Sequence, residues 1–186
     1  MGKITMGQVK TPPPVKLVIG FIFATEEILK EVCLILSQRF GEIDHESEIL
    51  PFTITDYYRE EMGGNLKRKF VSYRTLIEVG SLSEIKLLTN SIEMQVAIEE
   101  EGKKKRRVNI DPGYLEASKF VLATTKNYQH RLYIGQGIYG EVTLRFRNKT
   151  FESWEWTYPD YKTAESIHFF NDVRKIYMEQ LRRSPS

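Results

Sequence analysis

The sequence has little cysteine and no long apolar run. Its 186 residues include one cysteine, Cys33, which excludes an internal disulfide and suits a reducing compartment. No apolar stretch reaches the roughly 18 to 20 residues that a membrane-spanning helix needs, and residues 1–10 lack the apolar core of a signal peptide. We therefore expect a cytoplasmic protein with no membrane anchor.

Histidine and net charge are also scarce. His45, His130 and His168 are not spaced with Cys33 or with one another as zinc ligands usually are, which disfavours a zinc site. The many carboxylates leave Mg²⁺ open as a cofactor. Lys and Arg total 27 against 25 Asp and Glu, a net charge of +2. This excess is too small for a surface devoted to nucleic acid, so any polyanion site must be a local patch.

The overall composition is that of a folded domain. Hydrophobic residues make up 41% of the chain, aromatic residues 12% and charged residues 28%, which are ordinary values for a globular protein. At this length one domain can bury a self-sufficient core. We expect a polar, proline-rich leader over residues 1–14, a single α+β domain over 15–182 and a frayed tail over 183–186.

Hydrophobic periodicity and turn residues predict the secondary structure. The elements expected first are a strand over 15–23 buried on both faces, a helix between a Thr25 cap and Gly41, an extended segment over 43–55 with a long loop, a strand over 70–79, a helix from a capping box at Ser81 to Gly102, and a strand over 107–110. This is the order of a ferredoxin-like split βαβ core.

The remaining residues extend that core. Short strands are expected over 119–125, 131–134, 138–146 and 151–157, with Asn148-Lys149 as a tight hairpin turn. Thr163 is expected to cap a final amphipathic helix. The predicted fold class is therefore α+β, a ferredoxin-like core extended by C-terminal antiparallel strands, with helices packed on the sheet.

Two conspicuous runs have ordinary alternatives. Residues 135–142 (GQGIYGEV) match the glycine-rich loop of protein kinases, but no kinase catalytic loop or metal-binding motif follows. A dinucleotide fingerprint would open a helix, and a strand pattern follows instead. We favour a hairpin turn over a phosphate-cradling hairpin. The basic run 103–107 is interpreted as solvated surface; the alternative is a polyanion patch enlarged by residues 67–69.

Polar and titratable residues concentrate at the predicted strand ends. Asn109 and Asp111 stand where a buried strand is expected to end, although Asp-Pro-Gly is also turn chemistry. Between two later strands, residues 124–131 combine hydroxyls, a lysine, an imidazole and a guanidinium. This set suits anion binding and proton transfer. Asp56 and Asp160 each stand beside tyrosines, where aromatic packing is the alternative.

Several of these segments carry a family resemblance: Pro14-Val15-Lys16-Leu17, Thr55-Asp56-Tyr57-Tyr58, Leu66-Lys67-Arg68-Lys69-Phe70, residues 109–114 (NIDPGY), 123–126 (ATTK) with His130-Arg131, and 157–161 (TYPDY). In this order they resemble the prokaryotic family catalogued as domain of unknown function 4416. The resemblance covers nearly the whole chain and implies a full-length single domain. It implies no activity, substrate or catalytic residue.

Two classes of function stay open. In the first, an enzyme or nucleotide-binding protein holds a phosphate- or carboxylate-bearing ligand. His130 carries a proton, Lys126 and Arg131 hold the anion, and Asp111 with Asp160 binds Mg²⁺ or orients a nucleophile. The further candidates for ligand binding are Asp56, Asn109 and Lys119.

The second class is a non-catalytic module that binds RNA or a protein through an exposed sheet. Its stacking or anchoring surfaces would be Tyr57, Tyr58, Tyr114, Tyr158 and Tyr161. The aromatic signature of RNA-recognition domains is absent from residues 15–23 and 70–79, which disfavours RNA recognition of that kind. Steep salt dependence of any RNA binding would indicate the basic patch instead.

Overall fold

The computed structural model describes residues 7–53, 58–100 and 102–183. The elements are β1 (Val15–Phe23), α1 (Glu26–Phe40), β2 (Ile43–Glu46), β3 (Leu50–Pro51), α2 (Arg59–Met62), β4 (Lys67–Ile77), α3 (Leu82–Gln95), β5 (Ile98–Glu100), β6 (Lys103–Lys105), β7 (Val108–Leu115), β8 (Lys119–Thr124), β9 (Leu132–Gly135), β10 (Ile138–Arg147), β11 (Thr150–Ser153) and α4 (Ala164–Arg183). Short 3-10 turns lie at Val79–Ser81 and Pro159–Tyr161.

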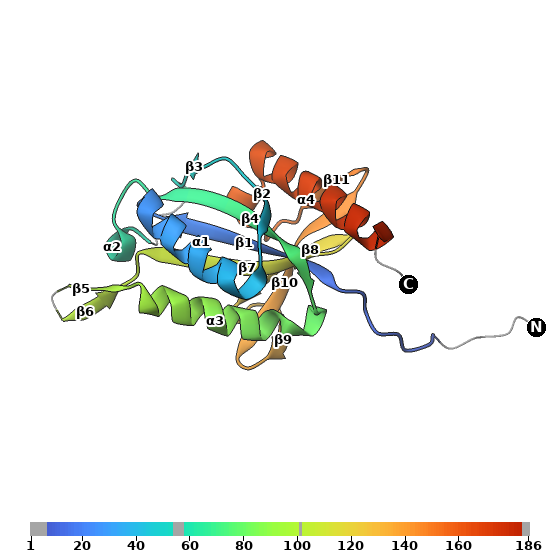
Figure 1. Cartoon of the computed structure of the whole chain (residues 1–186), viewed down its shortest axis with the longest axis horizontal. Coiled ribbons are helices and arrows are strands. Elements are labelled where there is room, and N and C mark those ends of the chain that lie inside the picture. Colours follow the sequence, from blue (N-terminus) through green and yellow to red (C-terminus); the bar gives the residue numbers. More distant parts are fainter. Residues whose placement is uncertain (1–6, 54–57, 101, 184–186) are drawn as a thin grey trace, which may run out of the picture.

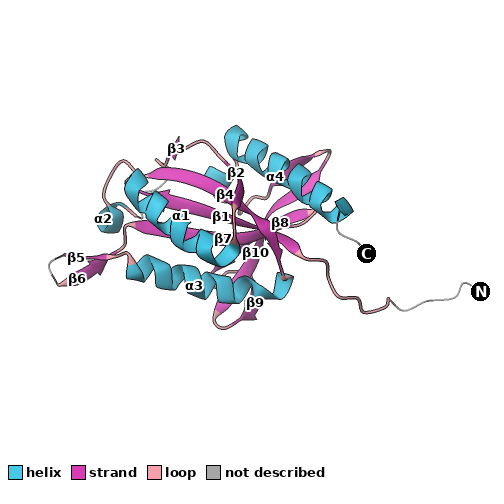
Figure 2. Ribbon diagram, viewed as in Figure 1, coloured by secondary structure: helices cyan, strands magenta, loops and turns pink. Residues whose placement is uncertain are grey.

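One large sheet forms the centre of the molecule (Figures 1 and 2). Its strand order is β11-β10-β8-β7-β1-β4-β2, with β3 paired to β4 and β9 paired to β10. The paired strands run antiparallel. The α+β class is therefore confirmed, and the ferredoxin-like assignment of the core stays a prediction.

Strand β1 occupies the interior of the sheet, between β7 and β4. All nine of its residues are buried, as the run of apolar and β-branched residues predicts, because a strand covered on both faces has no need of alternation. Leu17, Ile19 and Phe21 face a core completed by α1 and α3. Val18 faces the opposite core, which α4 completes with Phe170. Figure 1 shows α1 and α3 together on one face of the sheet.

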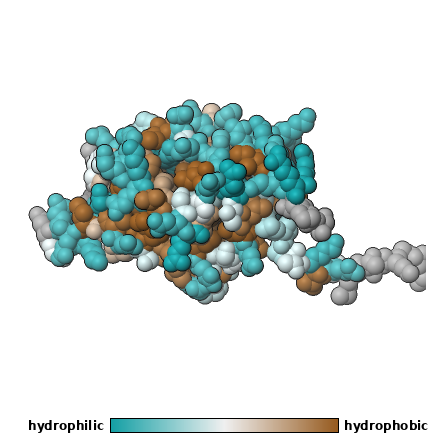
Figure 3. Space-filling model, viewed as in Figure 1, coloured by the Kyte–Doolittle hydropathy of each residue, from teal (hydrophilic) through white to brown (hydrophobic). Residues whose placement is uncertain are grey.

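The surface in this view is largely hydrophilic, with apolar patches between the charged side chains (Figure 3). Exposed apolar residues of the two helices include Leu34 on α1 and Leu87 on α3. Scattered exposed residues of this kind are normal for a folded protein. No helix in the described part of the chain has the length and apolarity needed to cross a bilayer.

Several turns and caps agree with the sequence. Gly41 follows α1 with φ +86°, and Asn148 and Lys149 both have positive φ in the β10–β11 turn. Gly137, at φ +77°, lies in a tight turn between β9 and β10, so the hairpin interpretation of the glycine-rich run is confirmed. Thr163 Oγ1 accepts a hydrogen bond from Ser166 N–H at 3.1 Å, the expected cap of α4.

Other boundaries were wrong. Neither Thr25 nor Ser81 makes a side-chain capping bond. Helix α3 ends at Gln95, and β5 and β6 then form a hairpin that pairs Glu100 with Lys103. The acidic and basic runs therefore neutralise each other across strands instead of following a helix. The segment over 43–55 is divided into two short strands, of which β3 has two residues.

The largest difference concerns β7. The strand continues through Asp111-Pro112-Gly113 to Leu115, where turn chemistry indicated an end. Pairing with β1 along its whole length holds this segment extended, because a ladder of backbone hydrogen bonds outweighs a local turn preference. Asn109 and Asp111 therefore lie within a strand, on the face that does not contact α1.

Candidate functional site

The sheet opens between β7 and β8. These strands pair only where residues 113–115 meet residues 120–122, so the first half of β7 has no strand on that edge. Pro112 stands at the boundary and has no N–H to continue the ladder. Backbone groups of alternate residues face the same edge, so Ile110 must find partners elsewhere.

Helix α3 supplies those partners. Glu93 Oε1 accepts the Ile110 N–H at 2.6 Å, and Lys86 Nζ donates to the Ile110 carbonyl at 2.8 Å. Both side chains are buried. Two ionisable side chains thus replace a strand, which keeps the β7–β8 opening free of backbone.

A pocket of about 710 Å³ occupies this opening. Most of its lining is apolar and includes Ile22, Phe52, Leu122 and Ala123. Four cationic side chains, Arg68, Lys86, Arg106 and Lys126, also line it, together with the three acids Glu93, Asp111 and Asp160. An apolar cavity of this size with a few converging polar groups is the usual form of a small-molecule site.

Arg68 lies at the floor of the pocket and is 2% exposed. Its guanidinium passes over Gly20 of β1, where a Cβ would stand 2.7 Å from Nη2. It also lies 4.5 Å from the centre of the Phe70 ring and 4.9 Å from that of Tyr161. Gly20 is therefore needed as glycine, because any side chain would displace the guanidinium from between these rings.

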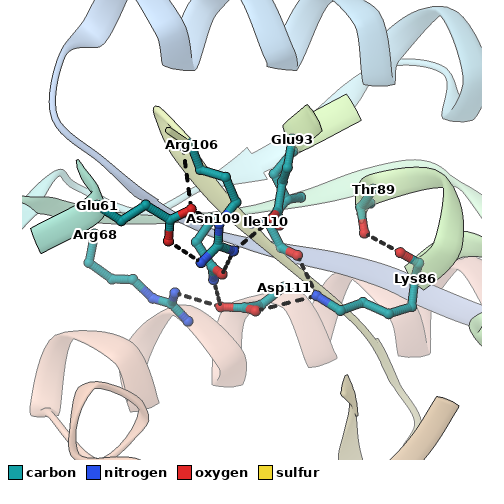
Figure 4. Close-up of polar contacts among 9 residues, drawn as sticks. All are labelled: Glu61, Arg68, Lys86, Thr89, Glu93, Arg106, Asn109, Ile110 and Asp111. Atoms are coloured by element: carbon teal, nitrogen blue, oxygen red, sulfur yellow. Dashed lines mark hydrogen bonds and ion pairs between the residues drawn. The ribbon is translucent and has the colours of Figure 1, made fainter. Parts of the chain in front are cut away.

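Two carboxylates share this guanidinium. Arg68 Nη1 donates to Asp111 Oδ2 at 3.2 Å, and Arg68 Nε lies 3.1 Å from Asp160 Oδ2 at an angle unsuited to a hydrogen bond. Asp111 also accepts from Asn109 Nδ2 at 2.8 Å, and its Oδ1 lies 3.7 Å from Lys86 Nζ. Figure 4 shows Asp111 between Arg68 and Lys86.

The pKa values of the two acids are shifted in opposite directions. Burial alone would raise the pKa of Asp111, but the charges of Lys86 and Arg68 and two hydrogen bonds outweigh it, so this pKa is lowered. Burial raises the pKa of Asp160 more than Arg68 lowers it, and the charge of Asp111 adds to the rise. One carboxylate is thus held ionised while its neighbour is easier to protonate, a division of roles typical of acid–base pairs.

Arg106 organises the wall next to this pair. Its guanidinium donates to Glu61 at 2.7 Å, to Glu93 at 2.9 Å and to Asn109 at 3.2 Å (Figure 4). Burial raises the pKa of Glu93, although Lys86, Ile110 N–H and Arg106 oppose the rise. The network connects the loop before β7 to α3 and α2.

Three buried polar atoms at the floor have no hydrogen-bond partner among the described residues. They are Arg68 Nε, Arg68 Nη2 and Tyr161 Oη. Both residues line the pocket, and both are 2% exposed. Because buried polar groups in folded proteins are nearly always paired, each unpaired group requires an explanation, such as a bound molecule.

A second cluster lies behind the pocket rim. Glu141 of β10 is buried, and its Oε2 lies 2.7 Å from Arg131 Nε and 3.3 Å from His130 Nε2. Arg131 Nη2 donates to the hydroxyl of Tyr158 at 2.8 Å, and Tyr158 lines the pocket. The His130 ring stacks on Trp156, with 5.2 Å between ring centres.

Comparison with known protein families identifies one family to which this chain is similar. The profile described as "Domain of unknown function (DUF4416)" matches residues 13–177. The chain belongs to this family. No curated protein and no solved structure matches it significantly. The family segment runs from the residues just before β1 into α4 and so includes every side chain described above.

Only some of the candidate site residues predicted from the sequence line the pocket. Asn109, Asp111, Lys126 and Asp160 line the same pocket. Arg131 and His130 meet at Glu141 instead, and Arg131 reaches the rim through Tyr158.

The remaining two candidates are not at the pocket. Lys119 binds Glu116 at 2.9 Å and lies three residues, about 10 Å, along β8 from the pocket residue Leu122. Asp56 lies outside the described residues. Within the described ranges, no group of three or more His, Cys, Asp or Glu side chains is arranged to hold a metal ion.

Sequence reasoning missed the centre of the site. Arg68 stands in the run Lys67-Arg68-Lys69, which entered only as an enlargement of the alternative polyanion patch. It is the buried member of the run, while Lys69 pairs with Glu46. Alternation with Phe70 in a strand is the signal that could have found it. Lys86 and Glu93 lie seven residues apart, so helical periodicity places them on the same face of α3. It does not identify β7 as the strand that they bind.

Proposed function

We propose that the pocket between β7 and β8 binds a small organic anion that carries phosphate or carboxylate, such as a nucleotide, in a cytosolic setting. The observation that carries the proposal is the set of four cations, Arg68, Lys86, Arg106 and Lys126, converging on one largely apolar cavity. The size supports it as well, because ligand cavities commonly measure about 300 to 1,000 Å³.

Charge supports an anion over a cation. The lining has four cationic side chains against three acids, and Glu61 holds Arg106 from outside the lining. The pKa of two of the lining acids, Glu93 and Asp160, is raised by burial. A bound anion would compensate the positive charge that protonation of either acid adds.

Chemistry at the floor supports proton transfer on a bound ligand. A ligand that reaches the floor meets Asp111, whose side chain is 21% exposed, and Asp160, 10% exposed. An ionised carboxylate beside one that protonates more readily is the combination that general acid–base catalysis uses. His130 does not line the pocket, so Asp160 is the better proton donor.

The test is a thermal-shift screen against nucleotides, sugar phosphates and small dicarboxylates, each with and without Mg²⁺. A ligand at about a hundredfold its dissociation constant adds about 2.7 kcal/mol, or roughly 5 to 10 °C for a domain of this size. Lys126→Met should abolish the shift. The control Lys119→Met removes the same charge from a residue of β8 that does not line the pocket, and it should leave the shift intact.

Two outcomes would overturn the proposal. One is a panel with no shift, and the other is a shift that Lys126→Met and Asp111→Asn both leave unchanged. The alternative of RNA or protein binding through an exposed sheet is weakened because α1 and α3 cover one face and α4 covers much of the other. Tyr161, one of its proposed stacking residues, is buried.

A further inference from the structure

The protein covers the free edges of its sheet with side chains. On β7, Glu93 accepts the Ile110 N–H at 2.6 Å. On β11, Asn171 of α4 accepts the Phe151 N–H at 2.9 Å. The outermost strand at the other end, β2, carries Glu46, whose side chain is 60% exposed. Capping groups and charges of this kind prevent one sheet from adding to another.

Strand β9 is the exception. No side chain and no strand other than β10 is hydrogen-bonded to its backbone within the described ranges. Its three apolar residues are exposed in succession: Leu132 at 77%, Tyr133 at 63% and Ile134 at 37%. Because successive residues of a strand point to opposite faces, both faces of β9 are open to solvent.

This edge is nevertheless ordered. The ring of Tyr133 packs against that of Tyr139 on β10, with 5.6 Å between the ring centres, and its hydroxyl accepts the Gly137 N–H at 3.4 Å. The turn is closed by residues with positive φ, Gln136 and Gly137. A strand held in this way loses little conformational entropy when it binds a partner. Figure 1 shows the β9–β10 hairpin projecting beyond α3.

We propose that β9 pairs with β9 of a second copy of this chain, antiparallel and about a two-fold axis. Antiparallel pairing of a strand with itself is isologous, so each residue meets the same segment in the partner. Residues 132–140 (LYIGQGIYG) contain no charge and no proline, so nothing repels or blocks the pairing. At β2, the same operation would bring the exposed carboxylate of Glu46 from each copy to the contact.

The exposed apolar area of β9 indicates how strongly the two copies should bind each other. At about 200 Å² for a fully exposed side chain of this size, the three exposed fractions leave roughly 350 Å² of apolar side chain on each copy. Stable interfaces bury about 800 Å² per partner, and transient ones less than about 600 Å². The dimer is therefore weak and forms only at high protein concentration.

Analytical ultracentrifugation of the full chain between about 2 and 200 μM tests this pairing. The sedimenting species should change from one chain to two over this range. Leu132→Lys places two like charges at the contact and should keep the protein monomeric at every concentration. Leu34→Lys is the matched control, because Leu34 is 65% exposed on α1, and it should dimerise as the parent does.

Amide hydrogen exchange locates the contact independently of any variant. Peptides that contain residues 132–135 should exchange more slowly at the high concentration, while those from β2 and β11 should not change. A parent chain that stays monomeric at about 200 μM would overturn the proposal. So would a dimer that persists in Leu132→Lys, or one whose protection lies outside β9.

Discussion

Replacement of Arg68 by methionine tests the organisation of the pocket floor most directly. Methionine fills much of the space between Phe70 and Tyr161 but removes the charge that Asp111 and Asp160 share at 3.2 and 3.1 Å. Asp111 keeps Lys86 and Asn109 as partners. Asp160 has no other cation among the described ion pairs, so most of the loss falls on it.

The magnitude follows from burial. Removing one member of a buried ion pair costs about 3 to 5 kcal/mol, because a charge is left uncompensated. The side chains of Arg68 and Asp160 are 3% and 10% exposed, which places the pair in this class. For a domain of this length, the melting temperature should fall by roughly 6 to 20 °C at pH 7.

The free energy lost in Arg68→Met should depend on pH. Burial already raises the pKa of Asp160 above its usual value, and loss of Arg68 raises it further. A carboxyl whose folded pKa exceeds its unfolded pKa costs stability as pH rises through the folded value. The free energy lost in Arg68→Met should therefore be smaller at pH 5 than at pH 8, by about 1.4 kcal/mol for each pH unit in which only the folded state binds the proton.

Urea unfolding at pH 5 and pH 8 measures both quantities. Lys69→Met serves as the control, since Lys69 is the next residue and pairs with Glu46, whose side chain is 60% exposed; its loss should stay within about 1 kcal/mol at both pH values. A loss below about 1 kcal/mol in Arg68→Met, or one equal at the two pH values, would refute the shared-guanidinium reasoning.

Two further predictions concern the same floor. Gly20→Ala should cost about 1 to 3 kcal/mol in urea unfolding, because its Cβ would stand 2.7 Å from Arg68 Nη2 and 3.0 Å from Phe70 Cε1. The control Gly80→Ala, whose Cβ would have no heavy atom within 4 Å, should cost less than about 0.5 kcal/mol. Equal losses in the two variants would contradict the steric argument. Asp111 has a lowered pKa, so the stability that its ionised form contributes is present above about pH 4 and is lost as pH falls through the folded pKa. Asp111→Asn should therefore flatten the dependence of unfolding free energy on pH between about pH 2 and 4. An unchanged slope would show that Asp111 is not held ionised.

Much of the fold follows from local pattern in the sequence. The apolar run over 15–23 specifies β1, because a strand covered on both faces needs no alternation. The φ angles required at Gly41 and Gly137 restrict those positions to turns. Thr163 and the apolar spacing after it specify α4, since capping and periodicity act within a few residues.

The site could be anticipated only in part. Asn109, Asp111, Lys126 and Asp160 were found as polar residues near apolar segments, and all four line the pocket. Their meeting could not be derived, because they come from β7, the end of β8 and the turn before α4. Distant segments come together through sheet pairing, and single-sequence patterns carry no register information for strands so far apart.

The sequence alone determined the α+β class, the strand β1 and the tight turns, since each depends on contacts between residues near in the chain. Tertiary structure decided which member of Lys67-Arg68-Lys69 is buried, where α3 ends and that β7 continues through Pro112. In each case a long-range ladder or ion pair outweighs a local preference worth at most about 1 kcal/mol per residue. The pocket exists for the same reason, because Lys86 and Glu93 of α3 bind the edge of β7 that β8 leaves free.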